Sequence, residues 1–230
     1  MPMRFPSIIA AASLMSVLPA VSNANLLVNG GFESPALSAT FAVYDQGADI
    51  GGWAVVGTGD PVNSMAVLRN DYTEYAGTLA FSPHGGIQSV DITGAANRGF
   101  NGVRQSVTTT VGADYEISFW VGNQDAAFPA YTLASAISLD IDGTSVGTFS
   151  NADNTSADVN WKQFTYGFQA TSATTTITFY NVTPSDDMMA GLDDVVLTSS
   201  AIPEPTSLAL LTVGALGTIR LRRRNGRIGG

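Results

Sequence analysis

The sequence predicts an all-β domain, an antiparallel sandwich of two sheets, lying between two apolar ends. Between residues 25 and 200, short runs rich in Thr, Val and aromatic residues alternate apolar with polar side chains, and Gly, Asn, Asp and Pro separate them. This period of two is typical of strands with one buried face. The same span lacks the 3.6-residue period of amphipathic helices. About ten such strands at this spacing suit two packed sheets.

The first 24 residues predict a secretory signal peptide. Arg4 supplies a short positive region, and residues 8–18 are apolar apart from two serines. Residues 22–24 (Ser-Asn-Ala) have the small side chains of a cleavage site. We therefore expect export through the Sec pathway and a mature chain that begins at Asn25.

The expected strands differ in strength but follow one another at short intervals. Asp142-Gly143 predicts a two-residue hairpin turn within the series, because both residue types accept positive φ angles. Residues 100–103 and 153–160 are expected to be loops. Strands are expected at residues 25–28, 53–56, 65–69, 78–81, 88–93, 103–109, 115–121, 137–141, 146–149, 163–168, 176–180 and 192–197.

Strand parity predicts one candidate ligand face. In the strand at 115–121 the odd-numbered apolar residues fill the core, so Trp120 points away from it. Tyr180 has the same parity in its own strand, and Asp140 and Arg104 also point outward. An outward aromatic ring can stack on a sugar, and the two charged groups can bind its hydroxyls. The alternative is that the loop of residues 125–134 covers Trp120, since exposed tryptophan is uncommon.

The domain is strongly acidic, which limits its partners. Between residues 25 and 200 there are 18 acidic and four basic residues, a formal charge of −14. Nucleic acids and anionic membrane surfaces both require clustered Lys and Arg, so neither is an expected partner. Cations such as calcium fit better, while simple solubility of an exported domain explains the charge equally well. The chain has no cysteine, which excludes disulfides, thiol catalysis and Cys-based metal sites.

Signatures of catalysis are weak. His84, the one histidine, lies in Ser-Pro-His-Gly-Gly and is expected to be a turn residue, and no Gly-x-Ser-x-Gly sequence marks a nucleophile. Asp193-Asp194 is an acidic doublet of the type that glycosidases use, but adjacent strand residues point to opposite faces. The doublet is therefore not expected to form a facing pair, and we predict a protein without enzymatic activity.

Three features follow one another at residues 201–230. The turn Pro203-Glu204-Pro205 precedes an apolar stretch at 206–221, for which we expect a short transmembrane helix. An arginine cluster comes last and is expected on the cytoplasmic side of the membrane. Its main members are Arg220, Arg222, Arg223 and Arg224.

This order of turn, apolar stretch and arginines resembles the PEP-CTERM sorting signal of Gram-negative bacteria. The resemblance implies that an exosortase, a membrane transpeptidase, cuts near the Pro-Glu-Pro motif. It also implies a transient anchor in the inner membrane, followed by a place at a cell surface or in a matrix often rich in exopolysaccharide. The alternative is an amphipathic core helix, although the apolar run shows no polar face.

The two ends of the domain carry a second resemblance. Residues 25–33 (NLLVNGGFE) and 191–197 (GLDDVVL) look like the first and last strands of galactose-binding-like jelly rolls, which include many carbohydrate-binding modules. The order of the motifs between them resembles the choice-of-anchor C family. The resemblance implies a jelly-roll sandwich with one structural calcium between Glu33 and Asp193. In the alternative, these two carboxylates accept hydrogen bonds from turn amides.

Together these features predict a signal peptide at 1–24, a jelly-roll domain at 25–200 and a sorting signal at 201–230. We expect an exported, exosortase-sorted surface or extracellular-matrix protein whose sandwich binds polysaccharide without catalysing a reaction. A purely structural matrix protein and an unrecognised hydrolase are the alternatives.

Overall fold

The computed structural model of the 230-residue chain describes residues 24–58, 62, 64–95, 99–124, 127–131, 133–153, 155, 157–184 and 189–200. The predicted sorting signal at 201–230, and the predicted signal peptide up to residue 23, lie outside these residues. Within the part of the chain that is described, no helix has the length and the apolar character needed to cross a bilayer.

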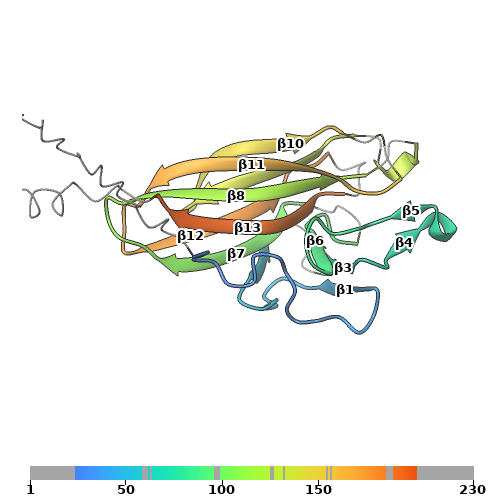
Figure 1. The fold of residues 1–230 in the computed structure, drawn as a ribbon, viewed down its shortest axis with the longest axis horizontal. Helices are drawn as coiled ribbons and strands as arrows, with labels where there is room; N and C mark the ends of the chain where they lie inside the picture. The colour runs from blue at the N-terminus through green and yellow to red at the C-terminus, as the bar shows by residue number, and fades with distance from the viewer. Residues whose placement is uncertain are drawn as a thin grey trace, which may run out of the picture.

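Two antiparallel sheets form a sandwich, which confirms the predicted all-β jelly-roll architecture (Figure 1). The six-stranded sheet contains, in spatial order, β1 (Phe41–Tyr44), β3 (Met65–Arg69), β6 (Gln88–Asp91), β13 (Gly191–Ser199), β8 (Asp114–Asn123) and β11 (Asn160–Gln169). The five-stranded sheet contains β10 (Thr144–Asn151), β9 (Ser135–Ile141), β12 (Thr174–Asn181), β7 (Asn101–Thr108) and β2 (Ala54–Gly57).

Alternation along the strands places one face of each sheet in a shared core. In β8 the odd-numbered residues 115–121 are buried, while the even-numbered ones point to the outer face. Asp142 and Gly143 have φ angles of 51° and 78° and turn β9 into β10, which confirms the predicted hairpin. The strand pattern therefore follows from side-chain alternation and from the positive φ angles of a short turn.

Two local predictions are wrong, and one strand was not predicted. Residues 25–28 form no strand, although Leu26 N donates to Leu197 O at 2.8 Å. Residues 101–103 belong to β7 rather than to a loop, because β2 and β12 pair with them on either side. The edge strand β1 was not expected, since its sequence Phe-Ala-Val-Tyr has no polar residue to alternate with.

A small second apolar cluster covers part of the outer face of the six-stranded sheet. The hairpin of β4 (Thr73–Glu74) and β5 (Leu79–Ala80), joined by the 3-10 helix η1 (Tyr75–Gly77), projects at one end of the molecule (Figure 1). Together with the 3-10 helix η2 (Pro129–Tyr131), it buries apolar side chains against β3. This end is where a groove forms, because the hairpin and β1 flank the same part of the sheet.

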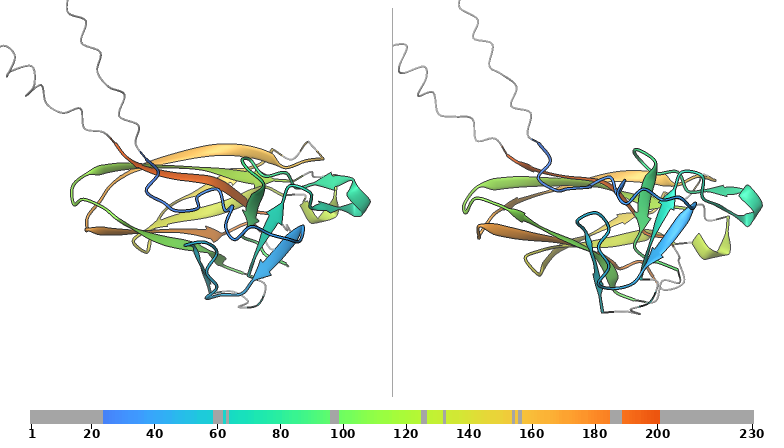
Figure 2. Two further views of the ribbon diagram at one scale, coloured as in Figure 1. Left: turned by 60° about the horizontal axis from the view of Figure 1, so that its bottom comes forward. Right: turned by 90° about the horizontal axis from the view of Figure 1, so that it is seen from below.

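One side chain ties the first and last segments of the domain together. Asn25 Nδ2 donates to the Val195 carbonyl at 2.9 Å, and Asn25 Oδ1 accepts from the amides of Leu27 and Leu197 at 3.1 and 2.8 Å. The described chain therefore begins and ends side by side, at the end of the sandwich opposite to the β4–β5 hairpin (Figure 2).

Candidate functional site

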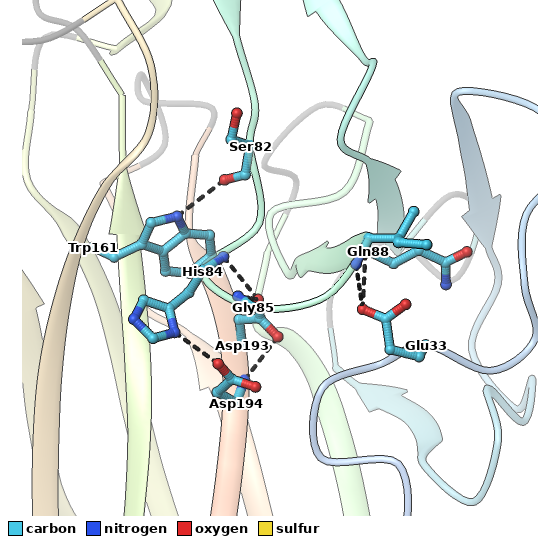
Figure 3. Close-up of polar contacts among 9 residues, drawn as sticks. Glu33, Ser82, His84, Gly85, Gln88, Trp161, Asp193 and Asp194 are labelled. Carbon is cyan, nitrogen blue, oxygen red and sulfur yellow. Dashed lines mark hydrogen bonds and ion pairs between the residues drawn. The ribbon is translucent and has the colours of Figure 1, made fainter.

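The loop of residues 82–87 crosses the outer face of the six-stranded sheet and is held there by carboxylates (Figure 3). Glu33 Oε1 accepts hydrogen bonds from the amides of Ile87 and Gln88 at 2.7 and 3.0 Å. Gly86 fits beside this carboxylate with a φ of 62°, because a Cβ atom there would collide with Glu33 Oε1. Glu33 thus fixes the C-terminal end of the loop.

Asp193 fixes the other end of the loop and is fully buried. Its Oδ2 accepts from the amides of His84 and Gly85 at 2.9 and 3.1 Å, and its Oδ1 accepts from the amide of Asp194 at 2.7 Å. Burial raises the pKa of the Asp193 carboxyl to about 7, although the amide donors act in the opposite direction. This carboxyl group therefore titrates close to neutral pH.

A β-bulge brings Asp194 to the same face as Asp193. The pairing of β13 with β8 shifts register between Asp193 and Val196, and Asp194 has a φ of 46°. Asp194 Oδ2 consequently lies 2.7 Å from Nδ1 of His84. The expectation that adjacent strand residues face opposite sides is wrong at this position, because the bulge interrupts the alternation.

The surroundings of Glu33 and Asp193 fit a calcium ion only in part. Both carboxylates accept hydrogen bonds from backbone amides, as the alternative prediction expects. Calcium takes about six to eight oxygen ligands. The backbone amides that donate to these carboxylates already occupy some of the lone pairs that a calcium ion would need. Within the described residues, no group of three or more His, Cys, Asp or Glu side chains is arranged to hold a metal ion. Structural calcium at these two residues stays a prediction.

Trp120 lies beneath the same loop. The imidazole of His84 stacks on its indole with ring centroids 3.7 Å apart and planes inclined by 17°. Trp161 meets the imidazole edge to face at 6.3 Å and donates its indole N–H to the Ser82 carbonyl at 3.0 Å. The Trp120 ring therefore points outward, as strand parity indicated, and His84 occupies one of its faces.

The other three residues of the predicted ligand face lie on the opposite sheet. Arg104, Asp140 and Tyr180 belong to the neighbouring strands β7, β9 and β12. Tyr180 stacks with Phe100 at a centroid distance of 4.6 Å and an angle of 23°. The structure thus brings these three residues together on the five-stranded sheet and places Trp120 on the six-stranded sheet.

A groove that the sequence did not predict opens between β1, β3 and the β4–β5 hairpin, with a volume of about 240 Å³. Four aromatic rings line it in series: Phe41, Tyr72, Phe81 and Tyr131. Neighbouring centroids are 5.3, 5.1 and 5.9 Å apart, and neighbouring planes are inclined by 61°, 58° and 67°. Phe81 and Tyr131 are buried, while Phe41 is 46% exposed at the rim.

Two carboxylates also line this groove. Glu74 accepts the hydroxyl protons of Tyr72 and Tyr131, one on each carboxylate oxygen, at 2.7 Å in both cases. Burial, reinforced by Glu74, raises the pKa of both phenols far above their usual range, so they remain donors to Glu74. Asp91 is only 6% exposed, and its Oδ1 accepts three hydrogen bonds from nearby backbone and hydroxyl groups.

The groove could not be predicted from the sequence, because its four aromatic residues come from separate segments of the chain. One signal was present: the stretch 72–81 (YTEYAGTLAF) holds three aromatic residues around an acid, in a region expected only to contain a weak strand. The residues of the predicted sorting signal cannot be placed in the same way. They lie outside the described residues: Pro203, Glu204, Pro205, Arg220, Arg222, Arg223 and Arg224.

Comparison with known families assigns two regions of the chain. The DUF642 family, described as a protein of unknown function, matches residues 25–198. The PEP-CTERM protein-sorting motif matches residues 201–224, which confirms the predicted sorting signal. No curated protein matches the chain.

Several solved structures resemble the sandwich at low sequence identity. TmCBM61 in complex with β-1,4-galactotriose is 17% identical with a TM-score of 0.45, over 76% of this chain and 99% of that one. A family 35 carbohydrate-binding module from Clostridium thermocellum is 10% identical with a TM-score of 0.43, over 70% of this chain and 100% of that one. The α-L-arabinofuranosidase MgGH51 is 12% identical with a TM-score of 0.45, over 77% of this chain but only 26% of that one. At these values, a function has to be argued from the residues of this chain.

Proposed function

We propose that this chain, which belongs to the DUF642 family, is an exosortase-sorted surface or extracellular-matrix protein whose sandwich binds polysaccharide without catalysing a reaction. The observation that carries the proposal is the aromatic groove beside the β4–β5 hairpin.

The lining of the groove suits a sugar ring. The C–H faces of a sugar pack on aromatic faces, and its hydroxyls donate to carboxylates. Phe41 offers such a face at the rim, and the Glu74 carboxylate offers acceptors. The volume of about 240 Å³ is below the roughly 300–1,000 Å³ of pockets that enclose drug-sized ligands. We therefore expect one ring of a longer polymer to enter while its neighbours stay outside.

The sorting motif supplies the location. Its match at residues 201–224 implies export and a surface or extracellular place. We infer that the apolar stretch holds the chain briefly in the inner membrane, with the arginines on the cytoplasmic side, until an exosortase cuts near Pro203-Glu204-Pro205. The domain then meets the polysaccharide that surrounds the cell.

A hydrolase is the second candidate, because Glu74 and Asp91 line the same groove and glycoside hydrolases use two carboxylates. The hydrogen bonds favour binding: both oxygens of Glu74 hold phenol protons, and Asp91 is nearly buried. Neither carboxylate is arranged to exchange protons freely with a glycosidic oxygen. Release of reducing ends from a polysaccharide panel, lost on Glu74→Gln, would establish the hydrolase instead.

Affinity electrophoresis of the full chain through gels that contain soluble polysaccharides tests the proposal. At least one polysaccharide should retard the wild type. Phe41→Ala should weaken binding about two- to thirteenfold, because an aromatic contact contributes about 0.5–1.5 kcal/mol beyond its buried area. Val111→Ala is a control, since Val111 is an exposed apolar residue outside the groove.

Two results would contradict the proposal. If no polysaccharide retards the wild type, the purely structural matrix protein becomes the better account. If Tyr180→Ala abolishes binding while Phe41→Ala does not, the ligand lies on the five-stranded sheet, which holds Tyr180, Arg104 and Asp140, three of the four residues of the predicted ligand face.

A further inference from the structure

We propose that the aromatic groove selects a sugar that carries a protonated amine, so that its ligand is a polymer containing hexosamine without the N-acetyl group. This inference rests on the proposed function and names the ligand class of the same groove.

The charge of the groove is the first argument. Among the described residues that line it, two are acidic, Glu74 and Asp91, and none is basic. The domain around it carries a formal charge of −14 between residues 25 and 200. A uronic acid or a sulfated sugar would therefore enter against a negative potential, whereas an ammonium group would enter with it.

The hydrogen-bonding inventory is the second argument. The Tyr72 and Tyr131 hydroxyls each donate their one hydrogen bond to Glu74, so toward a ligand each phenol oxygen can act only as an acceptor. Glu74 is an acceptor as well, because each carboxylate oxygen has more than one lone pair. These three side chains thus present acceptors to the groove, and an ammonium group is a donor with no acceptor. A carboxylate group of a ligand is an acceptor only. Neither it nor the groove side chains could then donate a hydrogen bond to the other.

The rings provide the third argument. A cation is attracted to an aromatic face when it lies within about 6 Å of the ring centroid. Phe41 is 46% exposed at the rim of the groove and can offer its ring to an ammonium group, whereas Phe81 and Tyr131 are buried. An N-acetyl group would lose the charge and bring a carbonyl acceptor to a lining of acceptors.

Calorimetric titration of the full chain with three soluble tetrasaccharides tests the inference: β-1,4-linked glucosamine, its fully N-acetylated form, and galacturonic acid. The measurement is made at a slightly acidic pH, where the glucosamine amines are protonated. The free amine should bind at least about tenfold more tightly than the acetylated form, the factor expected for a hydrogen bond to a charged group. The galacturonic acid oligomer should bind most weakly.

Matched variants separate the groove from the overall charge of the protein. Glu74→Gln should remove about tenfold or more of the preference for the free amine. Glu116→Gln makes the same change of charge at an exposed position of β8 outside the groove and should leave the preference unchanged. Equal losses in both variants would overturn the inference, because the preference would then come from net charge.

The remaining outcomes distinguish this inference from the proposed function. Equal or tighter binding of the acetylated tetrasaccharide would overturn the amine selectivity and leave polysaccharide binding intact. Absence of binding by all three, and by the wider polysaccharide panel, would overturn both. Equal binding of an oligolysine of the same charge would overturn the assignment to sugar. The acetylated and free tetrasaccharides are compared on the wild type, so the test stands even if Glu74→Gln does not fold.

Discussion

Asp193 makes the stability of the domain depend on pH in a direction opposite to that of most acidic residues. The carboxyl group has a pKa of about 3.9 in an unfolded chain, and burial raises it to about 7 in the folded one. The folded state therefore binds the proton more tightly. The stability that this adds is fully present below about pH 4 and is lost as the pH rises through about 7. Between about pH 5 and about pH 8, the free energy of unfolding should fall by about 2–3 kcal/mol through this residue alone.

Urea unfolding of the full chain, followed by tryptophan fluorescence in the presence of a chelator, measures this change. Asp193→Asn cannot titrate in this window, so the stability of the wild type relative to the variant should fall by about 2–3 kcal/mol across it. The variant should be less stable overall, because its side-chain NH₂ group cannot accept from the amides that Asp193 satisfies. Glu116→Gln removes an exposed acid instead and should keep the wild-type slope.

The reasoning is refuted if the wild type and Asp193→Asn show the same pH slope. It is also refuted if the wild type gains stability relative to the variant as the pH rises, because the carboxylate would then be stabilised by its amide donors more than it is penalised by burial.

Three further predictions concern the metal, the ends of the domain and the tail. If calcium binds at Glu33 and Asp193, it should raise the melting temperature of the wild type and not of the Glu33→Gln, Asp193→Asn variant; identical wild-type curves with calcium and with chelator would exclude the site. Asn25→Ala should lower the free energy of unfolding by about 1–3 kcal/mol, because it leaves two amides and a carbonyl of the first and last segments without this partner, and an unchanged urea midpoint would contradict this. Mass spectrometry of the mature exported form should find no peptide after about residue 205, and detection of residues 222–230 would contradict cleavage by an exosortase.

Periodicity in the sequence predicted most of the fold, because the alternation of apolar and polar residues in a strand indicates which of its faces is buried. The alternation in β8 indicated which of its residues fill the core and that Trp120 points outward. β1 was not predicted, because its four apolar and aromatic residues lack such a pattern. The bulge at Asp194 was not predicted either, because the register of a strand depends on its partner strand.

The candidate sites were harder to predict, since they depend on contacts between distant segments. Parity placed Trp120 and Tyr180 outward, but parity does not say which sheet a strand joins. Likewise, nothing local to His84 indicates that Asp193, 109 residues away, accepts its amide proton and so holds its ring over Trp120. The groove is an extreme case, because Phe41 and Tyr131 line it from distant parts of the chain and are linked only through the Tyr72 and Phe81 rings, which flank the hairpin.

The side-by-side ends of the domain have a consequence for export. Asn25 bonds to residues 170 and 172 positions later, and β13 lies between β6 and β8 in the middle of the six-stranded sheet. Without β13 this sheet consists of two separate parts, β1–β3–β6 and β8–β11. The six-stranded sheet is therefore incomplete until the last strand of the domain is present. Contacts of such long range are formed late and slowly. In a chain that emerges N-terminus first, the six-stranded sheet thus stays divided until β13 emerges, and this final strand completes the sheet immediately before the sorting motif.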